Sequence, residues 1–245
     1  MAHRIVILGA GTGGTLTANR LRREYSEAEA TITVVDQDDQ HVYQPGLLFL
    51  PFGLTTVEDI VKPRSKQLHR GIGYHQSAID RVDLETDTVH LEDGTDLQYD
   101  VLVVATGAAL LPEETEGLTG PGWGEKVHTF YTLEGAAALR ESLADFDGGR
   151  LAINIIDMPI KCPVAPLEFA FLADSYFHER KMRDKVEITY VTPLDAAFTK
   201  PVAAERLGGM LAEKHISLET ESVSYTHLTL PTTLCMCRSR WSPSH

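Results

Sequence analysis

The chain has 245 residues, of which 43% are hydrophobic and 23% charged, which suits one large or two ordinary globular domains. Its formal net charge of −13 argues against a nucleic-acid partner, because the phosphates would be repelled. No apolar run reaches the ~18 residues of a membrane span, and we expect no signal peptide because the N-terminus enters a strand at once. Three cysteines provide no disulfide framework, which fits a reducing, cytoplasmic compartment.

The first segment with a clear pattern is residues 4–36. The apolar run Ile5–Leu8 predicts a buried strand, and a helix is expected from Thr15 to about Tyr25. A second apolar run, Thr31–Val35, predicts the next strand. A strand, a glycine turn, a helix and a second strand make up the first βαβ unit of a dinucleotide-binding domain.

Three glycines in the turn, Gly9, Gly11 and Gly14, fit the spacing G-x-G-x-x-G. The first permits the tight turn, the second lets a pyrophosphate approach the backbone, and the third lets helix and strand pack closely. The helix N-terminus then offers N–H groups and a partial positive charge to the phosphates. Asp36 lies about 20 residues farther on, where a carboxylate accepts hydrogen bonds from ribose hydroxyls. The pattern favours nucleotide binding over an incidental glycine turn.

The next part of the chain shapes the surroundings of this unit. The loop from Gln40 to Leu47 contains Pro45, and it is either an ordinary surface loop or a segment whose backbone shapes a cofactor pocket. Leu54–Leu68 is expected to be a helix. Between Gly73 and Tyr99 the residues alternate, with Asp93-Gly94 at a hairpin turn, which predicts a small β-meander inserted into the sheet.

The segment Tyr99–Gly107 predicts a buried strand that ends in small residues, where the chain can pass close to a cofactor. Together with the glycine fingerprint and the meander, it resembles the flavoproteins that have two dinucleotide-binding domains. The resemblance implies an α/β fold with two Rossmann-like domains and FAD as the cofactor. It also implies roles for particular residues: Gly9, Gly11 and Gly14 on the pyrophosphate, Asp36 on the adenosine ribose, and Ala105, Thr106 and Gly107 beside the FAD.

A second unit of the same kind is expected to follow. A helix is predicted over Thr132–Ala144 and a strand over Arg150–Ile156, after which those flavoproteins carry a second glycine fingerprint for NAD(P)H. Here the segment Asp157–Pro163 contains two prolines and no glycine, and Asp157 would place negative charge where a pyrophosphate would sit. We therefore expect a second domain that keeps the fold signals and has lost NAD binding.

Cys162 stands in this altered turn. Pro166 is expected to start a helix that runs to about Arg180, so Cys162 precedes a helix N-terminus and follows Lys161. Both neighbours favour the thiolate over the thiol. Glu168 lies in the first or second turn of the helix. A buried, structural cysteine and an ordinary first-turn acid are the alternatives, but the place of Cys162 at a lost nucleotide turn favours a redox role.

At this point the resemblance narrows to the sulfide:quinone oxidoreductases, whose second domain also lacks a working NAD site and carries a redox cysteine followed by a nearby glutamate. It implies oxidation of sulfide through Cys162 and FAD, with quinone as electron acceptor and Glu168 as a candidate proton acceptor. It also implies that the loop with Pro45 lies near the flavin. The alternatives are a type II NADH dehydrogenase-like flavoprotein, and a catalytically inactive flavin-binding or sulfur-sensing module.

The remaining elements predicted for the second domain carry no assigned chemistry. They are a strand at Val186–Val191, a helix at Val202–Lys214 and a strand at Ile216–Thr220. The histidines are scattered without metal-ligand spacing, so no metal site is expected. The chain thus divides into residues 1–115, the N-terminal half of the FAD domain, and residues 116–222, an incomplete second domain.

The last segment, 223–245, differs in composition from the rest. Its first ten residues match one reading frame of a transposon-end adapter used in sequencing libraries, so we expect a non-native tail rather than the alternative, a genuine disordered tail. Cys235 and Cys237 would then drop out, which leaves Cys162 as the native cysteine. The chain is therefore expected to be an N-terminal fragment, both of whose domains are truncated. A partner cysteine, a quinone pocket and a peripheral anchor on the inner face of the cell membrane would lie in the missing part, and the oligomeric state is left open.

Overall fold

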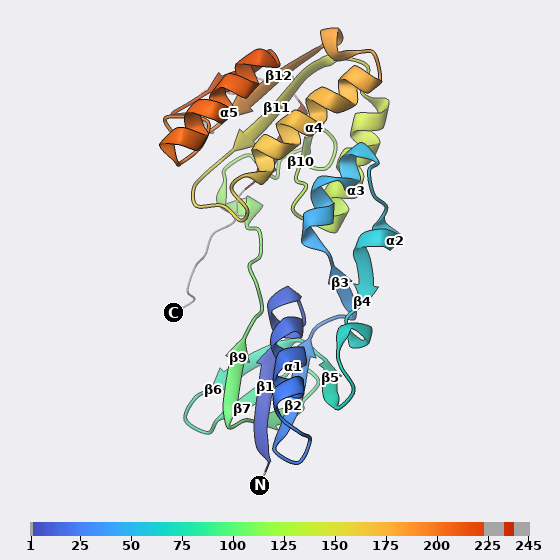
Figure 1. Ribbon diagram of the computed structural model, residues 1–245, viewed down its shortest axis with the longest axis vertical. Coiled ribbons are helices and arrows are strands. Elements are labelled where there is room, and N and C mark those ends of the chain that lie inside the picture. The colour runs from blue at the N-terminus through green and yellow to red at the C-terminus, as the bar shows by residue number, and fades with distance from the viewer. Residues whose placement is uncertain (1, 223–232, 238–245) are drawn as a thin grey trace. The chain divides into compact units, whose positions relative to one another are not determined.

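The computed structural model describes residues 2–222 and 233–237 and confirms an α/β protein with Rossmann-like parallel sheets (Figure 1). Two compact units are present. The first comprises the described residues up to Tyr43 together with Glu58–Gly107, and the second comprises Gln44–Val57 and the described residues from Ala108 onward. Each unit is described by itself.

The first unit is built on a four-stranded parallel sheet with the order β5-β2-β1-β9. Its register pairs Ile5 of β1 with Ile32 of β2 and with Val101 of β9. The helix α1 covers one face of this sheet (Figure 1). The bounds are His3–Leu8 for β1, Thr12–Glu24 for α1, Ala30–Asp36 for β2, Ile72–Gln76 for β5 and Val101–Val104 for β9.

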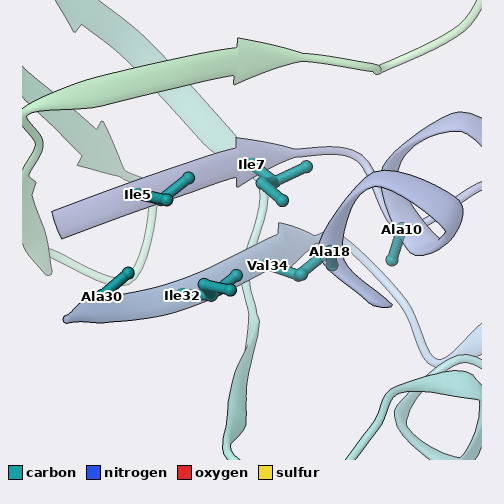
Figure 2. Close-up of a cluster of buried hydrophobic side chains, with 7 residues drawn as sticks. All are labelled: Ile5, Ile7, Ala10, Ala18, Ala30, Ile32 and Val34. Carbon is teal, nitrogen blue, oxygen red and sulfur yellow. The ribbon is translucent and has the colours of Figure 1, made fainter. Parts of the chain in front are cut away.

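The core beneath α1 is made of side chains from the first βαβ unit, as Figure 2 shows. Small residues on the helix side let α1 approach the branched side chains of the strands closely. The predicted strand, turn, helix and second strand are therefore confirmed. The helix begins at Thr12 rather than at Thr15, so the glycines at 13 and 14 lie inside its first turn. The cluster consists of Ile5, Ile7, Ala10, Ala18, Ala30, Ile32 and Val34.

A three-stranded antiparallel meander packs on the opposite face of the sheet, where Val89 and Leu91 meet Val6 and Leu8. The predicted turn after Leu91 is confirmed, with the Gly94 N–H donating to the Leu91 carbonyl at 3.0 Å. The predicted meander was expected to begin at Gly73, but the first strand in this region, β5 Ile72–Gln76, pairs in parallel with β2 instead. The meander strands are β6 Ile79–Asp83, β7 Thr88–Leu91 and β8 Asp96–Gln98.

The helix predicted over Leu54–Leu68 is wrong. Only one turn, α2 Val57–Ile60, is helical there, and the chain then forms β4 Val61–Pro63. β4 pairs antiparallel with β3 Gln40–Val42, and Pro63 cannot continue a helix in any case. A single 3-10 turn, η3 Ser65–Gln67, follows.

The strand β9 was expected to be buried, and this is wrong, because two of its four residues are exposed and the other two are only partly buried. Val101 is 47% exposed and Val104 is 68% exposed. The reason is topological, because β9 is an edge strand of the four-stranded sheet and pairs with β1 alone. Its apolar sequence is typical of a strand that is covered on both faces.

The second unit is built on a sheet with the order β10-β14-β11-β12-β13. The helix α4 packs on β11 and β12, α5 packs on β13, and α3 packs on β10 (Figure 1). The strands and helices predicted between Thr132 and Thr220 are thus confirmed within a residue or two. The bounds are β10 Val127–His128, α3 Leu133–Asp145, β11 Gly149–Ile155, α4 Ala165–Glu179, β12 Val186–Val191, α5 Pro201–Glu213, β13 Ile216–Glu219 and β14 Thr233–Cys237.

One strand of this sheet belongs to the segment for which a non-native origin is expected. β14 lies between β10 and β11 and pairs with both in parallel. The sequence pattern assigned no element to it. The rest of that segment, 223–232 and 238–245, lies outside the described residues, and its origin stays a prediction.

Aromatic side chains join the segment Gln44–Val57 to the helices of the second unit. Phe52 lies 4.8 Å from Phe169 between ring centroids, and Phe169 stacks on Phe130 at 4.9 Å with planes 7° apart. Phe52 ends the short turn η2 Leu50–Phe52, which follows η1 Gln44–Leu48. The remaining short turns are η4 Pro112–Glu114 and η5 Arg183–Lys185. Within the described ranges, the helices lack the combination of length and apolar character needed to cross a membrane.

A buried carboxylate ties the last elements of the second unit together. Asp174 in α4, 2% exposed in its side chain, accepts hydrogen bonds from Arg183 Nε and Lys214 Nζ, both at 2.7 Å. Burial alone would raise the pKa of Asp174, but the hydrogen bonds and charges of Lys214 and Arg183 outweigh it and leave the pKa lowered. The ion pairs link α4 to η5 and to the end of α5.

We expect the variant Asp174→Ala to lose about 3–5 kcal/mol of unfolding free energy, because it leaves a buried cation without its partner. Because the folded pKa of Asp174 is lowered, its contribution is present above the ordinary value of 3.8 and is lost as the pH falls below it. Urea denaturation followed by circular dichroism at several pH values measures both effects. Glu187→Ala is the matched control, since its ion pair with Arg150 is exposed and should contribute at most about 1 kcal/mol.

Candidate dinucleotide site and cysteine turn

The glycine fingerprint lies at the carboxyl end of β1, between this strand and α1. At Gly9, where φ is +96°, an added Cβ would overlap the Ala105 carbonyl oxygen and lie 2.9 Å from the Thr106 Cα. At Gly14 an added Cβ would overlap the Gly9 carbonyl oxygen. These two positions are therefore closed by the protein's own backbone, as expected for a tight turn and for close helix–strand packing.

Gly11 differs from both, because among the described residues no atom other than those of Gly11 and its chain neighbours lies within 4 Å of the position its Cβ would take. Gly11 is also the N-cap of α1, and no side chain caps the helix there. The first N–H groups of a helix need partners, which an anion can provide. The open space at Gly11 and the uncapped helix fit the pyrophosphate of a dinucleotide such as FAD.

Asp36 ends β2 beside this turn. Its Oδ2 accepts a hydrogen bond from the Ala10 N–H at 2.6 Å, and its Oδ1 accepts one from the Gln37 N–H at 2.9 Å. Arg64 Nη1 lies 3.0 Å from Oδ2 in an ion pair whose side chains are 15% and 12% exposed. The carboxylate is thus held in place by the protein's own groups.

The residues predicted to lie beside the cofactor follow β9. The Ala105 N–H donates to the Leu8 carbonyl at 2.7 Å, so the chain continues along β1 to the fingerprint. Backbone atoms of Ala105 and Thr106 lie next to Gly9. Gly107, the next residue, is exposed. The first unit therefore brings together Gly9, Gly11, Gly14, Asp36, Ala105 and Thr106 at one end of its sheet.

Pro45, the remaining predicted cofactor residue, is not brought to this end by the fold of the first unit. It is exposed in η1, and η1 belongs to the second unit. Its role near the flavin stays a prediction.

The cysteine turn connects β11 to α4 in the second unit. Cys162 is exposed and free, and it has a φ of +52°, a conformation that residues with side chains seldom adopt. Its carbonyl oxygen accepts hydrogen bonds from the Tyr131 hydroxyl at 3.1 Å and from the Ala165 N–H at 3.0 Å. The turn is therefore anchored at the Cys162 carbonyl oxygen, while the residue itself is exposed.

The side chains next to Cys162 differ in exposure. Lys161 is half-buried, and this burial lowers the pKa of its ammonium group. Glu168 is exposed in the first turn of α4. Lys161 directly precedes Cys162, and Glu168 follows it by six residues in the first turn of α4. The chemical roles of both residues stay predictions.

The second unit also differs from a working NAD site at the end of its second strand. An acidic residue would be needed there to accept hydrogen bonds from a ribose. β12 is instead followed by Thr192, which is fully buried and whose hydroxyl accepts a hydrogen bond from the Leu194 N–H at 3.2 Å. This agrees with the loss of the glycine fingerprint at Asp157–Pro163.

Two residues of these sites were missed by the sequence analysis. Arg64 follows β4 and reaches Asp36 only because β3 and β4 pair, so no local pattern marks it. Tyr131 lies 31 residues before Cys162, and its ring packs on Phe130 with centroids 4.8 Å apart. Neither contact has a signature in sequence spacing.

Comparisons with known proteins agree with this arrangement. The mitochondrial sulfide:quinone oxidoreductase of Mus musculus is 23% identical over 225 residues, which cover 92% of this chain and 48% of that protein. The type II NADH:quinone oxidoreductase of Staphylococcus aureus is 28% identical over 139 residues, covering 56% and 32%. The crystal structure of the sulfide:quinone oxidoreductase of Aquifex aeolicus has 22% identity and a TM-score of 0.81, covering 96% of this chain and 58% of that one.

The chain spans about half the length of the curated relatives it matches. The sulfide:quinone oxidoreductases among them are FAD-binding flavoproteins, which the geometry at Gly11 suits. The family described as pyridine nucleotide-disulphide oxidoreductase matches residues 3–154, from β1 to the strand before the cysteine turn. Because this match covers more than half of the chain, the chain belongs to the pyridine nucleotide-disulphide oxidoreductase family.

Proposed function

We propose that the chain forms the FAD-binding and cysteine-bearing part of a sulfide:quinone oxidoreductase, in which Cys162 carries the sulfur. The observation that carries this proposal is the turn between β11 and α4. A prolyl turn with an exposed cysteine stands where an NAD-binding domain has its glycine fingerprint. The similarity to sulfide:quinone oxidoreductases along 92% of the chain supports it.

The chemistry proposed for Cys162 is thiol–disulfide exchange. Hydrosulfide attacks the Cys162 sulfur in a disulfide, a new S–S bond forms, and the partner cysteine leaves as a thiolate. A second nucleophile then removes the outer sulfur from Cys162, which becomes a thiolate. Loss of two electrons from the two thiolates restores the disulfide. FAD, when bound, supplies the two-electron acceptor, with quinone as the final oxidant.

The protein's own groups have three tasks in this scheme. The Cys162 backbone is held by Tyr131 and Ala165, so the sulfur is presented from a fixed turn. Glu168, exposed near the start of α4, takes up the proton that sulfide releases. The fingerprint and Asp36 bind the adenosine diphosphate part of the cofactor. The partner cysteine, the quinone pocket and a peripheral membrane contact belong to the rest of the complete enzyme.

A type II NADH dehydrogenase-like activity is the second candidate, because a relative of that name aligns over 56% of the chain. The second unit disfavours it. NADH would need a glycine turn and an acid on the second strand, whereas Pro159, Pro163 and the buried Thr192 stand there. A catalytically inactive sulfur-sensing module remains the candidate outside enzymes, and its cysteine would react without turnover.

Anaerobic titration of the complete, FAD-loaded enzyme tests the proposal. We expect sulfide to bleach the flavin absorbance and NADH to leave it unchanged, and we expect added quinone to restore the absorbance repeatedly. Rapid bleaching by NADH would favour the NADH dehydrogenase instead. Reaction with sulfide in a single turnover that quinone cannot renew would favour the sensing module.

A further inference from the structure

The Asp36 carboxylate is held by three donors, and this leaves it little capacity to accept further hydrogen bonds. Oδ2 accepts from the Ala10 N–H at 2.6 Å and pairs with Arg64 Nη1 at 3.0 Å, while Oδ1 accepts from the Gln37 N–H at 2.9 Å. A carboxylate offers about four acceptor positions in total. Three of them are in use, so the one that remains lies on Oδ1.

Backbone pairing and hydrogen bonds of the first unit fix the position of Arg64. The antiparallel pair β3–β4, in which Gln40 faces Pro63, returns the chain to the end of β2. The Arg64 N–H donates to the Asp39 carbonyl at 3.2 Å. The Asp39 carboxylate accepts from the Ser65 N–H at 2.8 Å and from its hydroxyl at 3.0 Å, and these bonds lower the pKa of Asp39. The backbone at Arg64 is thus fixed on both sides.

The charge of Arg64 matters because its pairing with Asp36 is largely buried, with side-chain exposures of 15% and 12%. Its second acidic partner, Asp38, is 43% exposed and 3.3 Å away, so it is the weaker contact. A buried carboxylate without a cation is unfavourable, and Arg64 offsets this penalty at Asp36.

We propose that Arg64 is a positioning residue of the dinucleotide site, which fixes Asp36 so that one acceptor position on Oδ1 is presented to the adenosine ribose. Arg64 acts through Asp36 and need not touch the nucleotide. The inference rests on the nucleotide site of the first unit and not on sulfide chemistry, so the two can fail separately.

Calorimetric titration of the full 245-residue chain with ADP, which carries the pyrophosphate and the ribose, tests this role. We expect Arg64→Gln to weaken ADP binding about tenfold, the loss of one charge-assisted hydrogen bond. The affinity for 2′,3′-dideoxy-ADP should change by less than about twofold, because that ligand has no hydroxyl for Asp36. Asp36→Asn should behave in the same way. The double variant should bind no more weakly than the weaker single variant, since the residues act as one unit.

Three comparisons complete the design. Arg81→Gln is the matched control, because its 3.9 Å pair with Asp80 is exposed, and it should leave the affinity for both nucleotides unchanged. Arg64→Lys keeps a cation beside Asp36 and should restore part of the lost ADP affinity. Thermal denaturation of each variant by circular dichroism reports on the fold.

Several outcomes would overturn the proposal. Equal losses for ADP and dideoxy-ADP would indicate a direct contact to phosphate or adenine, or a general weakening of the unit. Additive losses in the double variant, no rescue by lysine, or an unchanged ADP affinity in Arg64→Gln would exclude the positioning role. If the unaltered chain bound no ADP, the nucleotide site would be excluded as well, while the chemistry of Cys162 would keep its own test.

Discussion

Replacing Cys162 by serine is expected to abolish the bleaching of the flavin by sulfide in the complete enzyme, with FAD still bound. A serine oxygen cannot form the S–S bond on which the proposed exchange depends, nor leave as a thiolate. Cys162 is exposed and its turn is anchored by backbone hydrogen bonds, so the substitution should leave the fold unchanged. Anaerobic stopped-flow measurement of the flavin absorbance gives the rate, and the bound FAD is counted in the same spectrum.

Substitutions at two other residues distinguish the proposed role of the Cys162 sulfur from the roles of the groups around it. Glu168→Gln removes the proposed proton acceptor and should slow the reaction by ~10²–10⁴-fold without abolishing it, because water can partly substitute. Tyr131→Phe keeps the ring on Phe130 and removes only the hydroxyl that donates to the Cys162 carbonyl. It should slow the reaction less than Cys162→Ser. If Cys162→Ser still oxidised sulfide at the normal rate, the cysteine would return to a structural role.

The first βαβ unit could be predicted because its signals are local. A buried run such as Ile5–Leu8 and the spacing of the glycines restrict strand, turn and helix within a few residues. The helix predicted at Leu54–Leu68 failed for the opposite reason. In the structure, Val61–Pro63 in the middle of this segment forms a strand that pairs with Gln40–Val42. A pattern of side chains within the segment cannot reveal a strand partner that lies about 20 residues away.

The residues of the two candidate sites also differ in whether a local sequence signal marks them. Cys162 could be proposed as a site residue because it stands in a turn whose expected composition is known from the fingerprint it replaces, and this proposal stays a prediction. Arg64 could not be found, because its contact with Asp36 exists only after β3 and β4 have paired. The alternation between Gly73 and Tyr99 predicted strands but did not identify β2 as the partner of β5, since the side-chain period is the same in the meander and in the parallel sheet.

The glycines of the fingerprint should respond differently to the same substitution. In Gly14→Ala the new methyl group would overlap the Gly9 carbonyl oxygen and lie 3.3 Å from the Ile7 Cγ2. The helix α1 would have to move away from β1, and we expect a loss of about 1–3 kcal/mol of unfolding free energy together with the loss of FAD. Urea denaturation and the FAD content after gel filtration measure the two effects.

In Gly11→Ala the methyl group meets no atom of the described residues beyond its chain neighbours within 4 Å, and the φ of −71° suits alanine. The unfolding free energy should therefore change by less than about 0.5 kcal/mol. The methyl group nevertheless enters the space through which a pyrophosphate reaches the helix N-terminus, so FAD should bind about tenfold more weakly or be lost. Gly208→Ala in α5, where the space is equally open, is the control; it should keep FAD and raise the unfolding free energy by up to about 1 kcal/mol, because alanine favours the helix interior over glycine. Normal FAD content in Gly11→Ala would show that the pyrophosphate does not lie against this turn, because a methyl group there can be tolerated only if no ligand atom occupies that space.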